Sequence, residues 1–145
     1  MYKRQVDLLL PPSQLQRLLA EADYLVLAVP LTPETRGLIG PRELATMKRG
    51  ARLINVARGS VVDEDALLDA LRSGHLAGAV LDVFRQEPLP PESGLWELPQ
   101  VLLTPHISGG TPRYMERAVE LFCDNLRRYL AGEPLRNVVD PQRGY

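Results

Sequence analysis

Four short runs of apolar residues occur along the chain, and each ends in polar or turn-forming residues. The runs are Tyr24–Val29, Ala51–Ala57, Ala77–Val83 and Val101–Leu103. Apolar residues follow one another in these runs instead of alternating with polar ones, which is typical of strands covered on both faces of a parallel sheet. The pattern therefore predicts four buried, parallel strands.

Apolar positions with helical spacing lie between these runs. Ser13 can cap a helix ahead of the first strand, and Asp63 can cap a helix between the second and third strands that ends before Gly74. A weaker helix is predicted over Pro41–Met47. Strands that alternate with helices predict an α/β fold with a parallel sheet of the Rossmann type and flanking helices.

The longest predicted helix lies near the C-terminus. Thr111 with Pro112 opens it, and Gly132 ends it. Its apolar residues form a single stripe that consists of Met115, Val119, Phe122, Leu126 and Leu130. The tail from Glu133 onwards is predicted to be irregular.

Composition narrows the classes of function. The chain has 145 residues, enough for one globular unit with its own core, and 17 basic residues balance 18 acidic ones. A net charge of -1 gives no basic field for nucleic acid or for an anionic membrane. Cys123 is the one cysteine, which excludes a disulfide within the chain and a cysteine-based zinc site and fits a reducing, cytoplasmic setting. No segment reaches the roughly 18 apolar residues of a membrane span.

Three polar residues follow the last three predicted strands: Arg58, Glu87 and His106. The carboxyl ends of parallel strands meet at one edge of the sheet, where such folds place their sites. A guanidinium suits a carboxylate and an adjacent carbonyl oxygen, an imidazole can transfer a proton, and a carboxylate favours the charged imidazole. Taken singly, each residue also fits an ordinary loop position, so only their combination predicts a site.

Two further polar residues lie near these strands. Asp82 closes an apolar run, where a carboxylate costs free energy unless a partner meets it. We therefore expect Asp82 to bind something. His75 lies at a predicted helix end and is interpreted as a solvent-exposed linker residue, outside the site.

The motifs around these residues resemble those of the D-isomer-specific 2-hydroxyacid dehydrogenases, a group that includes glyoxylate and hydroxypyruvate reductases. Five blocks carry the resemblance, in the family's order and near its spacing: Val29–Ile39, Met47–Glu64, Leu76–Phe84, Glu87–Pro90 and Leu103–Gly109. Together they extend over nearly the whole chain.

The resemblance implies a catalytic role for three residues. Arg58 would bind the carboxylate and keto oxygen of a 2-oxo acid, His106 would protonate that oxygen, and Glu87 would keep His106 charged and oriented. NAD or NADP is the implied cofactor, and Asp82 would hold its nicotinamide. The other implied cofactor-binding residues are Val29, Pro30, Thr35, Val56, Ala57, Ser108 and Gly109, together with Arg58 and His106 themselves.

One element of a nucleotide site is missing from the sequence. None of the 11 glycines forms the Gly-x-Gly-x-x-Gly turn that binds pyrophosphate. We therefore expect an incomplete Rossmann-like sheet, with residues 1–110 as the C-terminal part of an NAD(P)-binding domain. Residues 111–145 are expected to pack towards a substrate domain that is mostly missing. The chain would be the C-terminal half of a longer dehydrogenase.

Functions of different classes remain open. The first is an oxidoreductase on small 2-oxo and 2-hydroxy acids that is inactive alone, because the missing turn supplies much of the cofactor's binding free energy. The second is a nicotinamide-responsive binding or regulatory protein of the same fold, and the third is an inert fragment. Retention of Arg58, Glu87 and His106 together favours the enzyme. An exposed sheet edge also predicts a homodimer.

Overall fold

The computed structural model describes residues 6–142 of the chain. The chain divides into two compact units, Met1–Pro105 and His106–Tyr145. Every strand lies in the first unit, and the long C-terminal helix lies in the second.

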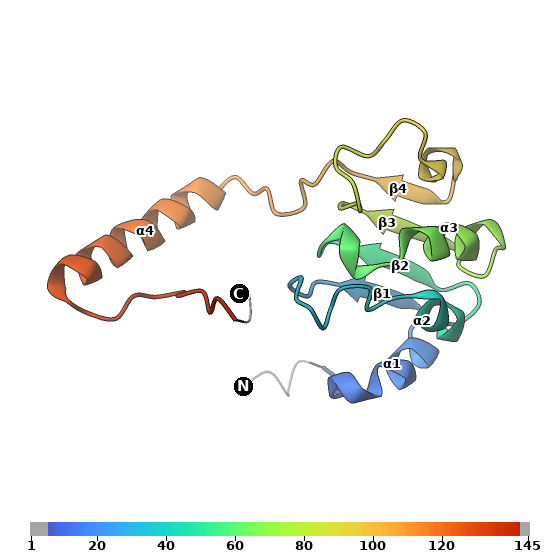
Figure 1. Ribbon diagram of the computed structural model, residues 1–145, viewed down its shortest axis with the longest axis horizontal. Helices are drawn as coiled ribbons and strands as arrows, with labels where there is room; N and C mark the ends of the chain where they lie inside the picture. The colour runs from blue at the N-terminus through green and yellow to red at the C-terminus, as the bar shows by residue number, and fades with distance from the viewer. Residues whose placement is uncertain (1–5, 143–145) are drawn as a thin grey trace. The chain divides into compact units, whose positions relative to one another are not determined.

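The first unit is built on a four-stranded parallel sheet with strand order β1-β2-β3-β4 (Figure 1). The strands are β1 (Tyr24–Leu27), β2 (Arg52–Asn55), β3 (Gly78–Leu81) and β4 (Val101–Leu103). Each lies within a predicted apolar run, so the predicted parallel sheet is confirmed. The last residue of each strand pairs with the last residue of its neighbour.

Three α-helices accompany the sheet: α1 (Leu15–Glu21), α2 (Pro41–Thr46) and α3 (Glu64–Arg72). The predicted cap of α3 is confirmed, because the Asp63 carboxylate accepts a hydrogen bond from the Ala66 N–H at 3.1 Å. The predicted Ser13 cap is wrong. Ser13 lies inside a short 3-10 helix, η2 (Pro12–Gln14), and α1 begins after Gln14 without a side-chain cap.

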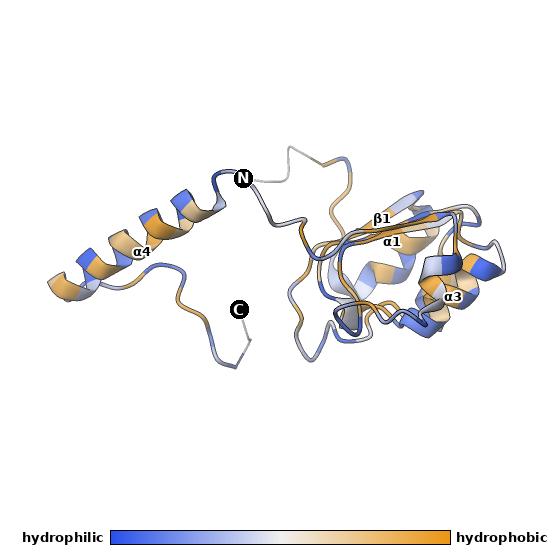
Figure 2. Ribbon diagram, turned by 90° about the horizontal axis from the view of Figure 1, so that it is seen from above, coloured by the Kyte–Doolittle hydropathy of each residue, from blue (hydrophilic) through white to orange (hydrophobic). Residues whose placement is uncertain are grey.

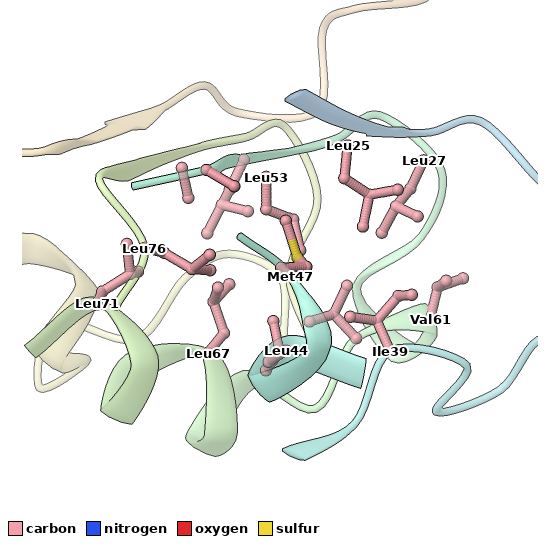
Figure 3. Packing of buried hydrophobic residues seen from close by; sticks show 14 of the residues in the cluster. Leu25, Leu27, Ile39, Leu44, Met47, Leu53, Val61, Leu67, Leu71 and Leu76 are labelled. Carbon is pink, nitrogen blue, oxygen red and sulfur yellow. The ribbon is translucent and has the colours of Figure 1, made fainter. Parts of the chain in front are cut away.

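The core lies between one face of the sheet and the helices (Figure 3). Leu25, Leu27 and Leu53 point from β1 and β2 towards Leu44 of α2 and Leu67 of α3, and all are at most 5% exposed. Burying each of these aliphatic side chains stabilises the fold by about 1.5–3 kcal/mol.

The opposite face of the sheet differs from the prediction of a fully covered sheet. The four strands were expected to be covered on both faces, but Val26 is 56% and Leu102 is 59% exposed. The parallel register places these residues in one row with Ile54 and Val80. Side chains alternate between the two faces of a strand, so an apolar run shows that both faces are apolar without showing what covers each one.

The second unit consists mainly of α4 (Tyr114–Ala131). Gly132 ends the helix with a left-handed backbone (φ 69), as the sequence predicts. No residue of α4 is buried, and Phe122 in its apolar stripe is 66% exposed. Figure 2 shows apolar and polar residues on different sides of α4.

Candidate active site

The residues that follow β2, β3 and β4 extend the sheet's hydrogen bonding by one position. Val56 N–H donates to the Leu27 carbonyl at 3.2 Å, Asp82 N–H to the Asn55 carbonyl at 3.1 Å, and Thr104 N–H to the Leu81 carbonyl at 3.0 Å. Val56, Asp82 and Thr104 therefore lie in register along the carboxyl edge of the sheet. This is the edge on which parallel α/β sheets place their ligands.

The turn that carries Arg58 is held by a buried amide. Asn55 is 1% exposed; its Oδ1 accepts from the Ala57 N–H, and its Nδ2 donates to the Arg58 carbonyl, both at 3.0 Å. The Arg58 side chain lies at the surface, and its Nη1 donates to the Ala57 carbonyl at 2.7 Å. A fixed backbone thus presents an exposed, permanently charged guanidinium.

Asp82 is a buried carboxylate with a partner in the neighbouring strand's extension. It is 2% exposed, and the Thr104 hydroxyl donates to its Oδ1 at 2.5 Å. The Thr104 hydroxyl is thus a partner for this buried carboxylate within the chain, and the binding of a nicotinamide by Asp82 stays a prediction. A hydrogen bond to a charged acceptor offsets part of the cost of burying it.

Glu87 closes the turn that follows β3. Its Oε1 accepts from the Phe84 N–H at 3.0 Å, while the Glu87 residue itself is exposed. The Phe84–Arg85 peptide lies directly against Gly59, where an added Cβ would overlap the Phe84 carbonyl group. The structure therefore brings together the turn that follows Arg58 and the turn that carries Glu87.

The turn after β1 contains three predicted cofactor residues. Thr35 Oγ1 donates to the Pro30 carbonyl and accepts from the Thr32 N–H, each at 2.7 Å. Val29 is half-buried and packs against the core. These contacts give the turn a defined shape beside the carboxyl end of β1, and its role in cofactor binding stays a prediction.

His106, Ser108 and Gly109 begin the second unit. His106 follows Pro105 and has a left-handed backbone (φ 53), a conformation uncommon outside glycine, asparagine, aspartate and histidine. A hydrogen bond from Gly110 N–H to the Ile107 carbonyl at 2.9 Å closes the turn that follows. Arg58, Asp82 and Glu87 belong to the first unit, so the pairing of Glu87 with His106 stays a prediction.

His75 differs from its predicted role as an exposed linker residue. It is half-buried, and its Nε2 lies 3.1 Å from the Leu44 carbonyl oxygen. It lines a groove of about 740 Å³ beside α2 and α3 that contains none of the predicted site residues. The prediction missed this position because the carbonyl that meets the imidazole lies 31 residues away in the sequence.

Three residues that support the predicted site were not among the predicted ones: Asn55, Thr104 and Glu64. An amide inside an apolar run is a signal that could have identified Asn55. Thr104, at the end of the last run, gave a weaker signal. Glu64 accepts a hydrogen bond from the Arg85 N–H at 3.0 Å across 21 residues, which no local pattern predicts.

Neither a metal site nor a membrane-spanning helix is found in the part of the chain that the structure describes. Residues 6–142 contain no group of three or more His, Cys, Asp or Glu residues placed to hold a metal ion. Among the same residues, no helix is both long and apolar enough to cross a membrane.

Comparison with known proteins identifies the family. The NAD binding domain of the D-isomer specific 2-hydroxyacid dehydrogenases matches residues 3–108, well over half of the chain. The chain belongs to the D-isomer specific 2-hydroxyacid dehydrogenase family. The expected family and α/β fold are thereby confirmed, and the Rossmann-type sheet is that of the family's nucleotide-binding domain.

Relatives within the family include reductases of small 2-oxo acids. Glyoxylate/hydroxypyruvate reductase B of Pectobacterium carotovorum is 50% identical over 128 residues, which are 88% of this chain and 40% of that protein. The chain therefore spans about 40% of the length of the curated relative that it matches.

Solved structures agree in fold and carry bound cofactor. A D-isomer specific 2-hydroxyacid dehydrogenase from Xanthobacter autotrophicus, in complex with NADPH and MES, superposes with a TM-score of 0.86 at 52% identity. The match covers 92% of this chain and 54% of that one. An NADPH-dependent glyoxylate/hydroxypyruvate reductase from Sinorhizobium meliloti gives a TM-score of 0.85 at 37% identity, covering 92% and 43% of the two chains.

Proposed function

We propose that this chain supplies the nicotinamide side of an NAD(P)-dependent oxidoreductase that interconverts 2-oxo and 2-hydroxy acids of the glyoxylate and hydroxypyruvate type. The observation that carries the proposal is the exposed Arg58 guanidinium, on a backbone that Asn55 holds at the carboxyl edge of a family nucleotide-binding sheet. A guanidinium can bind a carboxylate and an adjacent keto oxygen together, and these two groups are the common feature of such substrates.

The residues at this edge fit the nicotinamide part of the cofactor. Asp82 is a buried carboxylate, and a carboxylate is a suitable acceptor for the amide N–H groups of a carboxamide. Val56 and Ala57 follow β2, and Val29, Pro30 and Thr35 follow β1, so all five would line the same edge. Ser108, with a small side chain, and Gly109, with none, follow His106 and would allow close approach of the ring. The pyrophosphate turn is not in this sequence.

Three residues would carry out the reaction on the substrate. Arg58 would bind the carboxylate and polarise the keto group. His106, as the imidazolium, would donate its proton to the keto oxygen, and Glu87 would stabilise that charged form. When bound, the nicotinamide supplies the hydride that the carbonyl carbon accepts. An oxygen that becomes negative between a guanidinium and an imidazolium is stabilised from both sides.

The proposal also assigns the two parts of the chain to domains of the complete enzyme. Residues 1–110 would form part of the NAD(P)-binding domain, and residues 111–145, with the exposed stripe of α4, would pack towards a substrate domain. The chain alone would reduce 2-oxo acids poorly. A homodimer and a reducing, cytoplasmic setting complete the proposal, the latter supported by the single, free Cys123.

The test compares the chain alone with a completed enzyme. In the completed form, this chain replaces the matching 128 residues of the Pectobacterium reductase. We expect the chimera to oxidise NAD(P)H with glyoxylate or hydroxypyruvate, while the 145-residue chain shows little turnover. His106→Ala should lower kcat of the chimera by about 10²–10⁴-fold, the usual contribution of a proton donor. Arg58→Ala should lower kcat and also raise KM.

The matched control is His75→Ala, which removes the chain's other histidine, outside the predicted site. Its kcat should stay near that of the unsubstituted chimera. Near-normal rates for both His106→Ala and Arg58→Ala would contradict the mechanism. A chimera that binds NADPH but never turns over would instead support the nicotinamide-responsive regulatory function.

A further inference from the structure

Two consecutive backbone amides after β3 donate to carboxylates from different parts of the chain. The Phe84 N–H donates to Glu87 Oε1, and the Arg85 N–H donates to Glu64 Oε2, each at 3.0 Å. The first bond folds the Glu87 side chain back over its own turn. The second attaches that turn to the first residue of α3.

The same turn is held from a second direction by Gly59. The Phe84 carbonyl group and the Arg85 nitrogen lie so close to Gly59 that any side chain there would overlap them. Gly59 begins a short 3-10 helix, η3 (Gly59–Val61), which leads into α3. The continuous segment from Arg58 to Glu64 therefore contacts the Glu87 turn at both Gly59 and Glu64.

A simpler role for Glu64 would be to stabilise the N-terminus of α3, where acidic residues interact favourably with the helix dipole. That role needs no particular acceptor geometry, and Asp63 already caps the helix through the Ala66 N–H. Glu64 Oε2 instead meets an amide that lies outside α3. The bond to Arg85 is therefore a specific attachment between the helix and the turn.

A second contact joins the same elements. The Arg85 guanidinium pairs with Asp65 at 2.8 Å, but these side chains are 58% and 72% exposed. Exposed ion pairs contribute little to stability, because solvent screens them and two flexible side chains must be ordered. The bond to Glu64 differs in kind, because it ends on the backbone of the turn and so constrains the position of the Arg85 main chain.

We propose that Glu64 is a positioning residue of the site, which fixes the turn of Glu87 relative to Arg58 by accepting the Arg85 N–H. This inference rests on the proposed function of Arg58 and Glu87 and adds the residue that sets their spacing. Glu64 acts through the backbone of the turn and not on substrate or cofactor.

The test is an NMR comparison of Glu64→Ala and Glu64→Gln in the 145-residue chain without cofactor. Glutamine keeps a carbonyl oxygen that can accept the Arg85 N–H, whereas alanine does not. We expect Glu64→Ala to accelerate amide hydrogen exchange at Arg85 by about tenfold or more, the effect of losing a bond to a charged acceptor. It should also shift the Glu87 carboxyl ¹³C resonance, and Glu64→Gln should restore most of both signals.

Asp65→Asn is the matched control. It weakens the exposed pair with Arg85 but keeps the Glu64 bond, so Arg85 amide exchange and the Glu87 resonance should stay close to those of the unsubstituted chain. Glu64→Ala spectra that match the unsubstituted chain at both positions would overturn the proposal, as would equal changes in Asp65→Asn. Because no substrate or cofactor is present, these outcomes are independent of whether the oxidoreductase function is correct.

Discussion

Position 59 has no room for a side chain, because Gly59 lies at the contact between two turns. An added Cβ would overlap the Phe84 carbonyl, which is backbone and can move only if the whole turn moves. We predict that Gly59→Ala lowers the free energy of unfolding by about 3 kcal/mol, at the upper end of the usual cost of overpacking. Chemical denaturation followed by circular dichroism measures this loss.

Gly40→Ala is the control for that measurement. The nearest atom to a Cβ at Gly40 would be a Glu43 carboxylate oxygen at an ordinary 3.5 Å. Gly40 precedes α2, where alanine is a poorer N-cap than glycine, so a loss of only about 1 kcal/mol or less is expected. Equal losses in the two variants would mean that the contact with Phe84 does not restrict Gly59.

Thr104 determines how Asp82 is accommodated in the protein interior. Thr104→Val keeps the shape of the side chain but removes the hydroxyl that donates to Asp82 Oδ1. We predict a loss of about 1–3 kcal/mol in the free energy of unfolding, because a buried charged acceptor loses a donor. Thr104→Ser keeps the hydroxyl and should lose clearly less. If serine and valine variants unfold at the same denaturant concentration, the hydroxyl does not support Asp82.

At the scale of elements, side chains of α4 hold the segment that follows it. Asn125 donates to the Arg136 carbonyl at 3.1 Å and accepts from the Arg136 N–H at 2.8 Å. Asp124 pairs with Arg128 at 3.0 Å and with Arg136 at 3.3 Å. The hydrogen bond from Arg128 is the main cause that lowers the pKa of Asp124 below its ordinary value of 3.8.

This arrangement predicts a pH dependence. A carboxyl whose pKa is lower in the folded state stabilises the fold above its ordinary pKa, and the stabilisation is lost as the pH falls through the lowered pKa. The contact of Arg136 with α4 should therefore persist at about pH 4 and weaken only at lower pH, because the pKa of Asp124 in the folded chain lies below 3.8. The Arg136 amide resonance, followed by NMR against pH, reports this change.

Asp124→Asn provides the comparison. The substitution keeps the size of the side chain but removes its titrating group. The Arg136 amide should then lose the part of its acid-dependent shift that comes from Asp124. An unchanged titration curve in this variant would show that Asp124 does not govern the contact.

At the scale of the whole molecule, the sheet has an edge and a face that could associate with another chain. β1 lies at one end of the strand order and β4 at the other. Val26 on β1 and Leu102 on β4 belong to the same exposed apolar row. A free strand edge is a template for pairing with a second chain.

We predict that the chain forms a dimer through β1 and that Val26→Lys makes it monomeric, since a charged side chain on an edge strand disfavours pairing. Sedimentation equilibrium measures the mass in solution. Leu102→Lys is the matched control, because it adds the same charge to the same row at the opposite edge and should leave the dimer intact. A monomeric unsubstituted chain, or equal effects of both substitutions, would contradict pairing through β1.

The sequence alone determined the local and family-level features of this protein. Apolar runs identified all four strands, Asp63 and Gly132 marked helix ends, and the motifs around Arg58 and Asp82 identified the family. These features depend on neighbouring residues, whose spacing and backbone preferences can be seen directly in a sequence.

Which distant residues meet is visible only in the folded structure. It showed that Thr104 bonds Asp82, that Gly59 contacts Phe84, that Glu64 holds Arg85, and that one face of the sheet is exposed. Such contacts join residues about 20 or more positions apart and leave no periodic signal in the sequence. They arise because parallel strands bring distant turns to one edge, where unpaired amides and carboxylates must find partners.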